Sequence, residues 1–84
     1  MADRLTIRVL LPRFRLIVGF IEEHGWAPTH RECGEMWGNT AASVKSSLDR
    51  MEKRGWIELG SHARQIRITD EGRAVLREHE DVEL

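Results

Sequence analysis

The sequence predicts a mainly α-helical fold with one small β-hairpin, and three observations support this prediction. Residues 29–54 have the pattern of two helices separated by a tight turn. An apolar stripe at helical spacing precedes them in residues 12–24. Two short alternating runs, 56–59 and 65–68, follow them. A three-helix core, a two-stranded wing and a C-terminal helix in this order make a winged helix-turn-helix.

The first part of the chain is predicted to hold an arm and a scaffold helix. Apolar and polar residues alternate in residues 5–11, which favours an extended segment, with an early helical turn or a frayed arm as the equal alternative. Pro12 suits the first position of a helix, because the N–H that proline lacks would have no helical partner there. The helix is expected to end at His24-Gly25. Its apolar stripe consists of Phe14, Ile17, Val18 and Ile21.

The second helix is marked by signals at both of its ends. Thr29 and Glu32 have the spacing of a capping box, in which each side chain satisfies a backbone N–H of the first turn. The helix therefore begins near His30. It cannot extend far past Met36, because Gly38-Asn39 favours the left-handed conformation that ends helices.

The third helix is predicted from Thr40 to Arg54, before Gly55. Its inner stripe is formed by Val44, Leu48 and Met51, and its opposite face by Lys45, Ser46, Asp49 and Lys53. In helix-turn-helix proteins the second helix of the pair enters the DNA major groove. We therefore predict that this is the recognition helix.

The alternating runs after Gly55 predict a hairpin. Their apolar residues Ile57, Leu59, Ile66 and Ile68 share one face. Between the runs, His62 and Arg64 are placed at a wing tip, where a basic side chain can meet the phosphate backbone or the minor groove. Thr69-Asp70-Glu71 begins the last helix, residues 74–76 give it a limited apolar face, and residues 78–84 are expected to fray.

Length, charge and cysteine usage narrow the class of protein. The 84 residues suit one domain, with an N-terminal arm at 1–11 and a C-terminal helix and tail at 69–84. Residues 1–68 hold 11 Lys and Arg against 8 Asp and Glu, while residues 69–84 hold 2 against 6, so the body is mildly basic despite a net charge of −1. The single cysteine and the lack of a secretory or membrane-spanning pattern predict a cytoplasmic protein.

The order of these elements resembles the amino-terminal DNA-binding domain of the LexA repressor family over residues 12–68. The most specific matches are Ala27-Pro28-Thr29 with Glu32 at the start of the second helix, and Lys53-Arg54-Gly55-Trp56-Ile57-Glu58 after the third. Arg64 falls where that family's wing has an arginine. The strand-to-helix exit at residues 68–73 instead resembles small winged-helix regulators of the MarR family.

The resemblance implies that the start of the third helix reads bases. The matching positions are Thr40, Ala42, Ser43, Lys45 and Ser46. Ala42 stands where the repressor has an asparagine, and Lys45 and Ser46 replace acidic residues, so any operator should differ. The repressor's protease domain and cleavage linker have no counterpart in these residues, and self-cleavage is therefore not expected.

Metal binding and catalysis are the weaker interpretations. His30 and Cys33 could share a helix face, but a structural zinc site needs four ligands, and we expect Cys33 to face the core. No anion loop or carboxylate pair accompanies a nucleophile, so we expect neither an enzyme nor a cofactor. Trp26, Trp37 and Trp56 are expected to pack in the core and connector rather than to stack on bases.

The sequence therefore predicts a sequence-specific double-stranded-DNA-binding protein, a transcriptional regulator of bacterial or phage type. Thr40, Ser43, Lys45 and Ser46 would approach base edges and phosphates, and Arg50, Lys53 and Arg64 would hold the backbone. The alternative is a winged-helix module that binds a protein partner without DNA. A homodimer through residues 4–11 or the C-terminal helix would raise the affinity of a small module.

Overall fold

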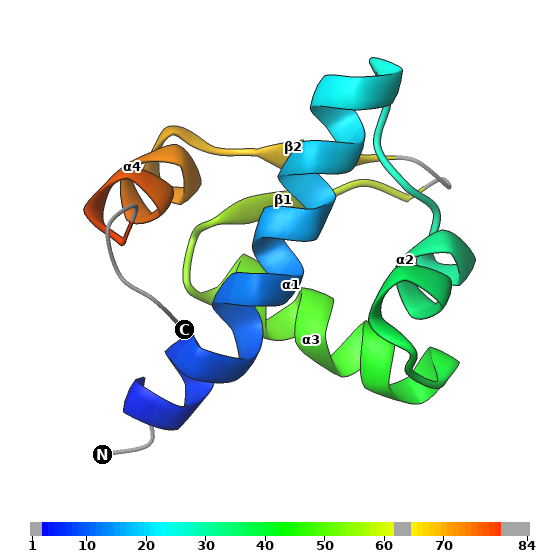
Figure 1. Ribbon diagram of the computed structural model, residues 1–84, viewed down its shortest axis with the longest axis horizontal. Coiled ribbons are helices and arrows are strands. Elements are labelled where there is room, and N and C mark those ends of the chain that lie inside the picture. The colour runs from blue at the N-terminus through cyan, green and yellow to red at the C-terminus, as the bar shows by residue number, and fades with distance from the viewer. Residues whose placement is uncertain (1–2, 62–64, 80–84) are drawn as a thin grey trace.

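The computed structural model describes residues 3–61 and 65–79, and it has the predicted winged helix-turn-helix fold. In Figure 1, α1 crosses in front of α3 and the hairpin, with α2 and α4 on opposite sides. The elements are α1 (Asp3–His24), α2 (His30–Trp37), α3 (Ala41–Lys53), β1 (Ile57–Leu59), β2 (Ile66–Ile68) and α4 (Asp70–Glu78). None of the described helices combines the length and the apolar character that a membrane crossing requires.

One hydrophobic cluster connects all of these elements. Its buried members are Leu10, Leu11, Phe14, Ile17, Val18, Ala27, Cys33, Val44, Leu48, Met51, Trp56, Ile57 and Ile66. Val75 and Leu76 bring α4 to the same cluster as half-buried side chains. The burial of Cys33 confirms the position expected for it on the inner face of α2.

The expectation of an extended arm is wrong. The first helix begins at Asp3 and contains Pro12 in its interior. The reason is that the inner stripe continues back through Leu11 and Leu10, both fully buried, to Ile7, and this helical spacing prevails over the alternation. Pro12 is exposed, so the carbonyl of Arg8, which loses its usual helical donor, is on the side where water can replace it.

The predicted caps of α2 are confirmed, and a threonine also caps α3. The Glu32 N–H donates to Thr29 Oγ1 (3.1 Å), and the Thr29 N–H donates to Glu32 Oε1 (2.9 Å), which completes the capping box. Gly38 ends α2 in the left-handed conformation (φ 69°). The hydroxyl of Thr40 then accepts from the Ser43 N–H (3.2 Å) and begins α3.

A partly buried polar contact joins the three core helices. Arg13 of α1 donates to the hydroxyl of Ser47 on α3 (2.6 Å), and its guanidinium lies 5.7 Å from the ring centre of Trp37 at the end of α2. Ser47 is only 4% exposed. One side chain of α1 thereby contacts both α2 and α3.

The hairpin has the two predicted strands, and its register follows from the structure. Ile57 pairs with Ile68, Glu58 with Arg67, and Leu59 with Ile66 in an antiparallel ladder. Along each strand a buried isoleucine is followed by an exposed charged residue and a half-buried apolar one. The wing therefore has one face on the core and one face in solvent.

Candidate nucleic-acid interface

The outer face of α3 gathers side chains from successive helical turns around a shallow depression. This depression has a volume of about 480 Å³ and is lined by Ala42, Lys45, Ser46, Asp49, Arg50 and Lys53. The inner face of the same helix buries Val44, Ser47, Leu48 and Met51. Since the core holds the inner face, the orientation of the outer face is fixed, and it presents three cations and one carboxylate to solvent.

The structure brings five of the eight sequence-predicted site residues together on this face. They are Ala42, Lys45, Ser46, Arg50 and Lys53. Thr40 and Ser43 lie at the cap, where the threonine hydroxyl is already held by the Ser43 N–H. Arg64 at the wing tip, and His62 beside it, lie outside the described residues.

Asp49 is a member of this face that the sequence analysis placed there without assigning it a role. Its Oδ2 lies 3.6 Å from Lys45 Nζ, in an i,i+4 ion pair between two exposed side chains. An exposed pair of this kind contributes only about 0.3–0.5 kcal/mol, so Lys45 can leave it for a stronger acceptor. A carboxylate at this position can accept from the amino group of cytosine and repels phosphate.

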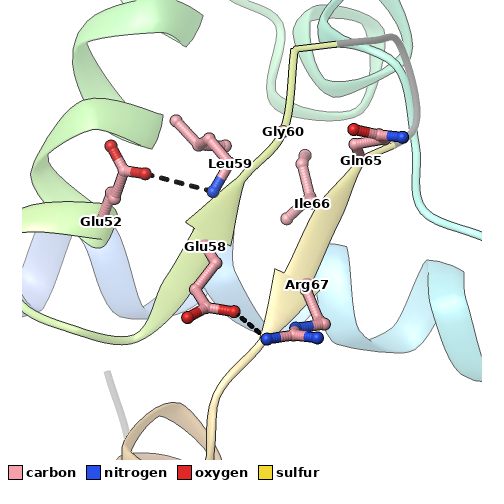
Figure 2. Close-up of a pocket in the computed structure, with 7 residues that line it drawn as sticks. All are labelled: Glu52, Glu58, Leu59, Gly60, Gln65, Ile66 and Arg67. Atoms are coloured by element: carbon pink, nitrogen blue, oxygen red, sulfur yellow. Dashed lines mark hydrogen bonds and ion pairs between the residues drawn. The ribbon is translucent and has the colours of Figure 1, made fainter.

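A second hollow, of about 710 Å³, lies between the end of α3 and the wing (Figure 2). Its lining consists of Glu52, Glu58, Leu59, Gly60, Gln65, Ile66 and Arg67. Arg67 is paired with Glu58 across the strands, and Glu52 adds a further negative charge. The described part of the wing therefore offers phosphate little net positive charge.

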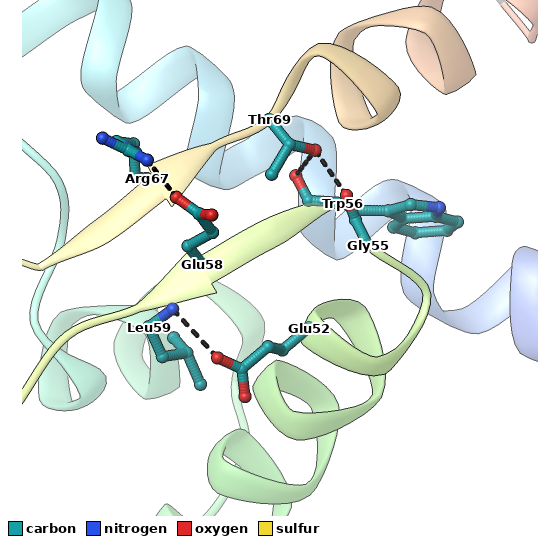
Figure 3. Close-up of polar contacts among 7 residues, drawn as sticks. All are labelled: Glu52, Gly55, Trp56, Glu58, Leu59, Arg67 and Thr69. Carbon is teal, nitrogen blue, oxygen red and sulfur yellow. Dashed lines mark hydrogen bonds and ion pairs between the residues drawn. The ribbon is translucent and has the colours of Figure 1, made fainter.

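Two polar contacts hold the wing against the helices (Figure 3). Glu52, near the end of α3, accepts from the Leu59 N–H of β1 (3.2 Å). The hydroxyl of Thr69 lies within hydrogen-bonding reach of the Gly55 and Trp56 carbonyls and accepts from the Gly72 N–H (2.9 Å), which caps α4 as predicted. The start of α4 is thereby attached to the segment that joins α3 to β1.

Gly72 allows this attachment because it has no side chain. A Cβ atom there would lie 2.3 Å from the Trp56 carbonyl oxygen and 2.8 Å from the ring of Phe14. Both distances are far inside van der Waals contact, so a larger residue would push α4 away from the wing. No signal in the sequence distinguished this glycine from those that end helices.

The alternative chemistries find little support in the described residues. Burial, and next the charge of Glu32, raise the pKa of the Cys33 thiol to about 11, so it stays protonated and unreactive at neutral pH. His30 is exposed, whereas Cys33 is buried. Among the described residues no three His, Cys, Asp or Glu side chains are close enough to hold a metal ion.

The three tryptophans do not behave alike. Trp56 is buried beside Phe14, with ring centres 5.2 Å apart, and Trp37 is half-buried against the core, as expected. Trp26 departs from the expectation, because it is 54% exposed and its ring stacks on the exposed ring of His24 (5.8 Å). It is therefore a surface residue at the end of α1 rather than packing for the connector.

Comparison with known families identifies one match. A family model described as the LexA DNA binding domain matches residues 5–65, which is 61 of the 84 residues and extends from α1 to the wing. Among curated proteins no match to the chain was found. The match includes the whole outer face of α3 and begins inside the segment that the alternation had suggested to be an arm.

Proposed function

The chain belongs to the LexA DNA-binding domain family, and from this premise we propose that it is a sequence-specific double-stranded-DNA-binding protein, a cytoplasmic transcriptional regulator of bacterial or phage type. In this proposal α3 enters the major groove and the wing tip touches the backbone. The observation that carries it is the outer face of α3, where exposed cations and small polar side chains share one side of a helix held by the core.

The dimensions and side chains of α3 suit a major groove. A helix of 13 residues is about 20 Å long, and the major groove, about 12 Å wide, admits a helix. Ala42 and Ser46 are small, so they allow close approach near the start of the helix. Lys45 lies between them on the same face and can reach the O6 and N7 acceptors of a guanine, while the methyl group of Ala42 suits a thymine methyl.

The remaining cations would position the helix rather than read bases. Arg50 and Lys53 extend from the later turns of α3, where the helix leaves the groove and meets phosphates. Arg64 would add a contact from the wing tip. Thr40 and Ser43, at the start of α3, would lie near base edges and phosphates.

A single module of this size binds DNA weakly, so we expect a second copy or a protein partner to contribute. The two dimer surfaces expected from the sequence are residues 4–11 and the C-terminal helix. Both expose less apolar surface than their composition suggested. Leu10 and Leu11 are buried in the chain's own core, and Val75 and Leu76 pack against it.

Fluorescence anisotropy with a labelled mixed-sequence duplex at low salt tests the proposal. We expect binding that weakens steeply as salt rises, because cations released from phosphates dominate the affinity. Selection on random duplex DNA would then define the preferred site. Absence of binding at high micromolar protein would contradict the proposal and favour the protein-interaction alternative.

The matched control is a pair of charge reversals on two exposed surfaces. Arg50→Glu on the outer face of α3 should abolish binding. Glu22→Lys on α1 adds positive charge on another exposed surface. If net charge alone governed the affinity, this variant would bind the duplex more tightly than the wild type. Equal and opposite changes for the two variants would show that only net charge matters.

A further inference from the structure

The outer face of α1 carries an apolar stripe that the domain itself covers only in part. Val9, Pro12, Leu16 and Phe20 follow one another at spacings of three, four and four, and therefore lie on one side of the helix. Val9 and Leu16 are each 46% exposed, although they are large aliphatic side chains. The buried residues of α1 lie on its opposite side, so the stripe points away from the core.

Gly19 borders this stripe in the second half of α1. A glycine inside a helix costs about 1 kcal/mol relative to alanine. Nothing in the fold requires this one, because a Cβ atom there would meet nothing within 4 Å. A missing side chain next to an exposed apolar stripe allows another helix to approach closely.

The charges beside the stripe are arranged so that the face is complementary to itself in one orientation. Arg8 lies near the N-terminal end of the stripe and Glu23 near its C-terminal end. Within the part of the chain that the structure describes, neither has a salt-bridge partner. Two such helices packed antiparallel, with Leu16 at the two-fold axis, bring Arg8 of each copy beside Glu23 of the other.

We propose that a second copy of this chain docks on the outer face of α1, antiparallel and two-fold symmetric, with Leu16 at the centre. The same register sets the Pro12 ring of one copy into the space beside Gly19 and Phe20 of the other. Every contact away from the two-fold axis is made twice, as an isologous interface requires. The stripe is only one helix wide, so the interface buries less than the roughly 1,600 Å² of a typical stable interface. We therefore expect a dissociation constant in the micromolar range.

Pairing through this face has a consequence for DNA. The outer faces of α1 and α3 lie on different sides of the shared core, and α1 crosses in front of α3 in Figure 1. Both α3 faces therefore stay uncovered and lie away from the dimer interface. This consequence rests on the DNA binding proposed above. The dimer brings two duplexes, or two distant segments of one duplex, together and does not read adjacent half-sites.

Sedimentation equilibrium of the full chain tests the pairing. The wild type should dimerise between about 10 and 500 μM, the range expected for a small interface. Arg8→Glu or Glu23→Arg alone should weaken association roughly fivefold to tenfold, and the double variant should restore it, because the swap recreates both ion pairs. A wild type that stays monomeric, or a double variant no better than the singles, would overturn the proposal.

A double dissociation separates pairing from DNA binding. Leu16→Glu should abolish dimerisation and leave the binding of one duplex per protomer intact, because Leu16 is exposed and remote from α3. Ser46→Glu should abolish duplex binding and leave dimerisation intact. Unchanged thermal unfolding of both variants verifies that they fold, and a dimer that survives Leu16→Glu would refute docking on this face.

Capture of a fluorescent duplex by beads that carry a second duplex tests the bridging. The wild type should capture it, and Leu16→Glu should not. If the wild type dimerises but binds no duplex, the proposed function fails while the pairing stands. If it dimerises and binds single duplexes but captures none on the beads, the bridging is wrong.

Discussion

The outer faces of α1 and α3 are both solvent-exposed sides of helices that share one core, yet their chemistry is opposite. The face of α3 carries hydroxyl, methyl and charged groups around a shallow depression. The face of α1 carries exposed aliphatic side chains, with Arg8 and Glu23 near its two ends. Folding does not require this difference between the outer faces, because the core uses only the inner side of each helix.

The contrast shows how a small domain can divide its surface between two kinds of partner. Nucleic-acid interfaces are polar and positively charged, whereas the centres of protein interfaces are apolar. The core fixes the orientation of each helix. A polar, cationic outer face therefore indicates a nucleic-acid partner, and an apolar outer face indicates a protein partner. Substitutions that affect one face, both faces or the support behind them should separate these roles.

The largest effect is expected at Gly72, which packs closely against Trp56 and Phe14 of the shared core. Gly72→Ala should lower the free energy of unfolding by about 2–3 kcal/mol, because the new methyl group collides with the Trp56 carbonyl and the Phe14 ring. Urea unfolding followed by tryptophan fluorescence measures the change. Duplex binding and pairing should decline together, and an unchanged midpoint would show that α4 can shift without cost.

A change at Lys45 should affect the α3 face alone. Lys45→Ala is expected to cost roughly 1–3 kcal/mol at the preferred duplex and to relax the preference there, if the lysine meets a guanine edge. Asp49→Ala is the control, since it removes the same ion pair and leaves the lysine in place. Arg64→Ala should weaken all sequences alike, and the same pattern for Lys45→Ala in anisotropy titrations would make it a phosphate contact.

Loss of the cap at Thr40 should have a smaller effect on stability. It tests how much this cap stabilises the start of α3. Thr40→Ala removes the acceptor for the Ser43 N–H and should destabilise the domain by about 1 kcal/mol. Thr40→Ser keeps the hydroxyl and should be nearly neutral in the same thermal melts. Pairing through α1 should respond to neither variant.

The smallest effect is expected at Gly19, and it has opposite signs for folding and for pairing. Gly19→Ala should raise the free energy of unfolding by about 0.5–1 kcal/mol, because alanine favours the helix and its methyl group meets open space. Dimerisation measured by sedimentation should weaken, since the second copy loses its close approach. A variant that gains stability and pairs as well as the wild type would place the interface elsewhere.

Local signals in the sequence were sufficient for most elements of the fold. The spacing of Thr29 and Glu32, the glycine at 38 and the alternation around the wing each act over a few residues, and the structure confirms them. The outer face of α3 was also predictable, because a helix that buries Val44, Leu48 and Met51 must turn the residues between them outward. The family match at residues 5–65 agrees with the resemblance over residues 12–68.

Tertiary packing decided what these local signals could not. Residues 5–11 satisfy both an alternating and a helical pattern, and only the core, which buries Leu10 and Leu11 side by side, selects the helix. The contact of Arg13 with Ser47, and the space that Gly72 leaves for Trp56, join residues far apart in the chain. Such contacts have no periodicity of their own, so a single sequence determines them only through the fold that it forms.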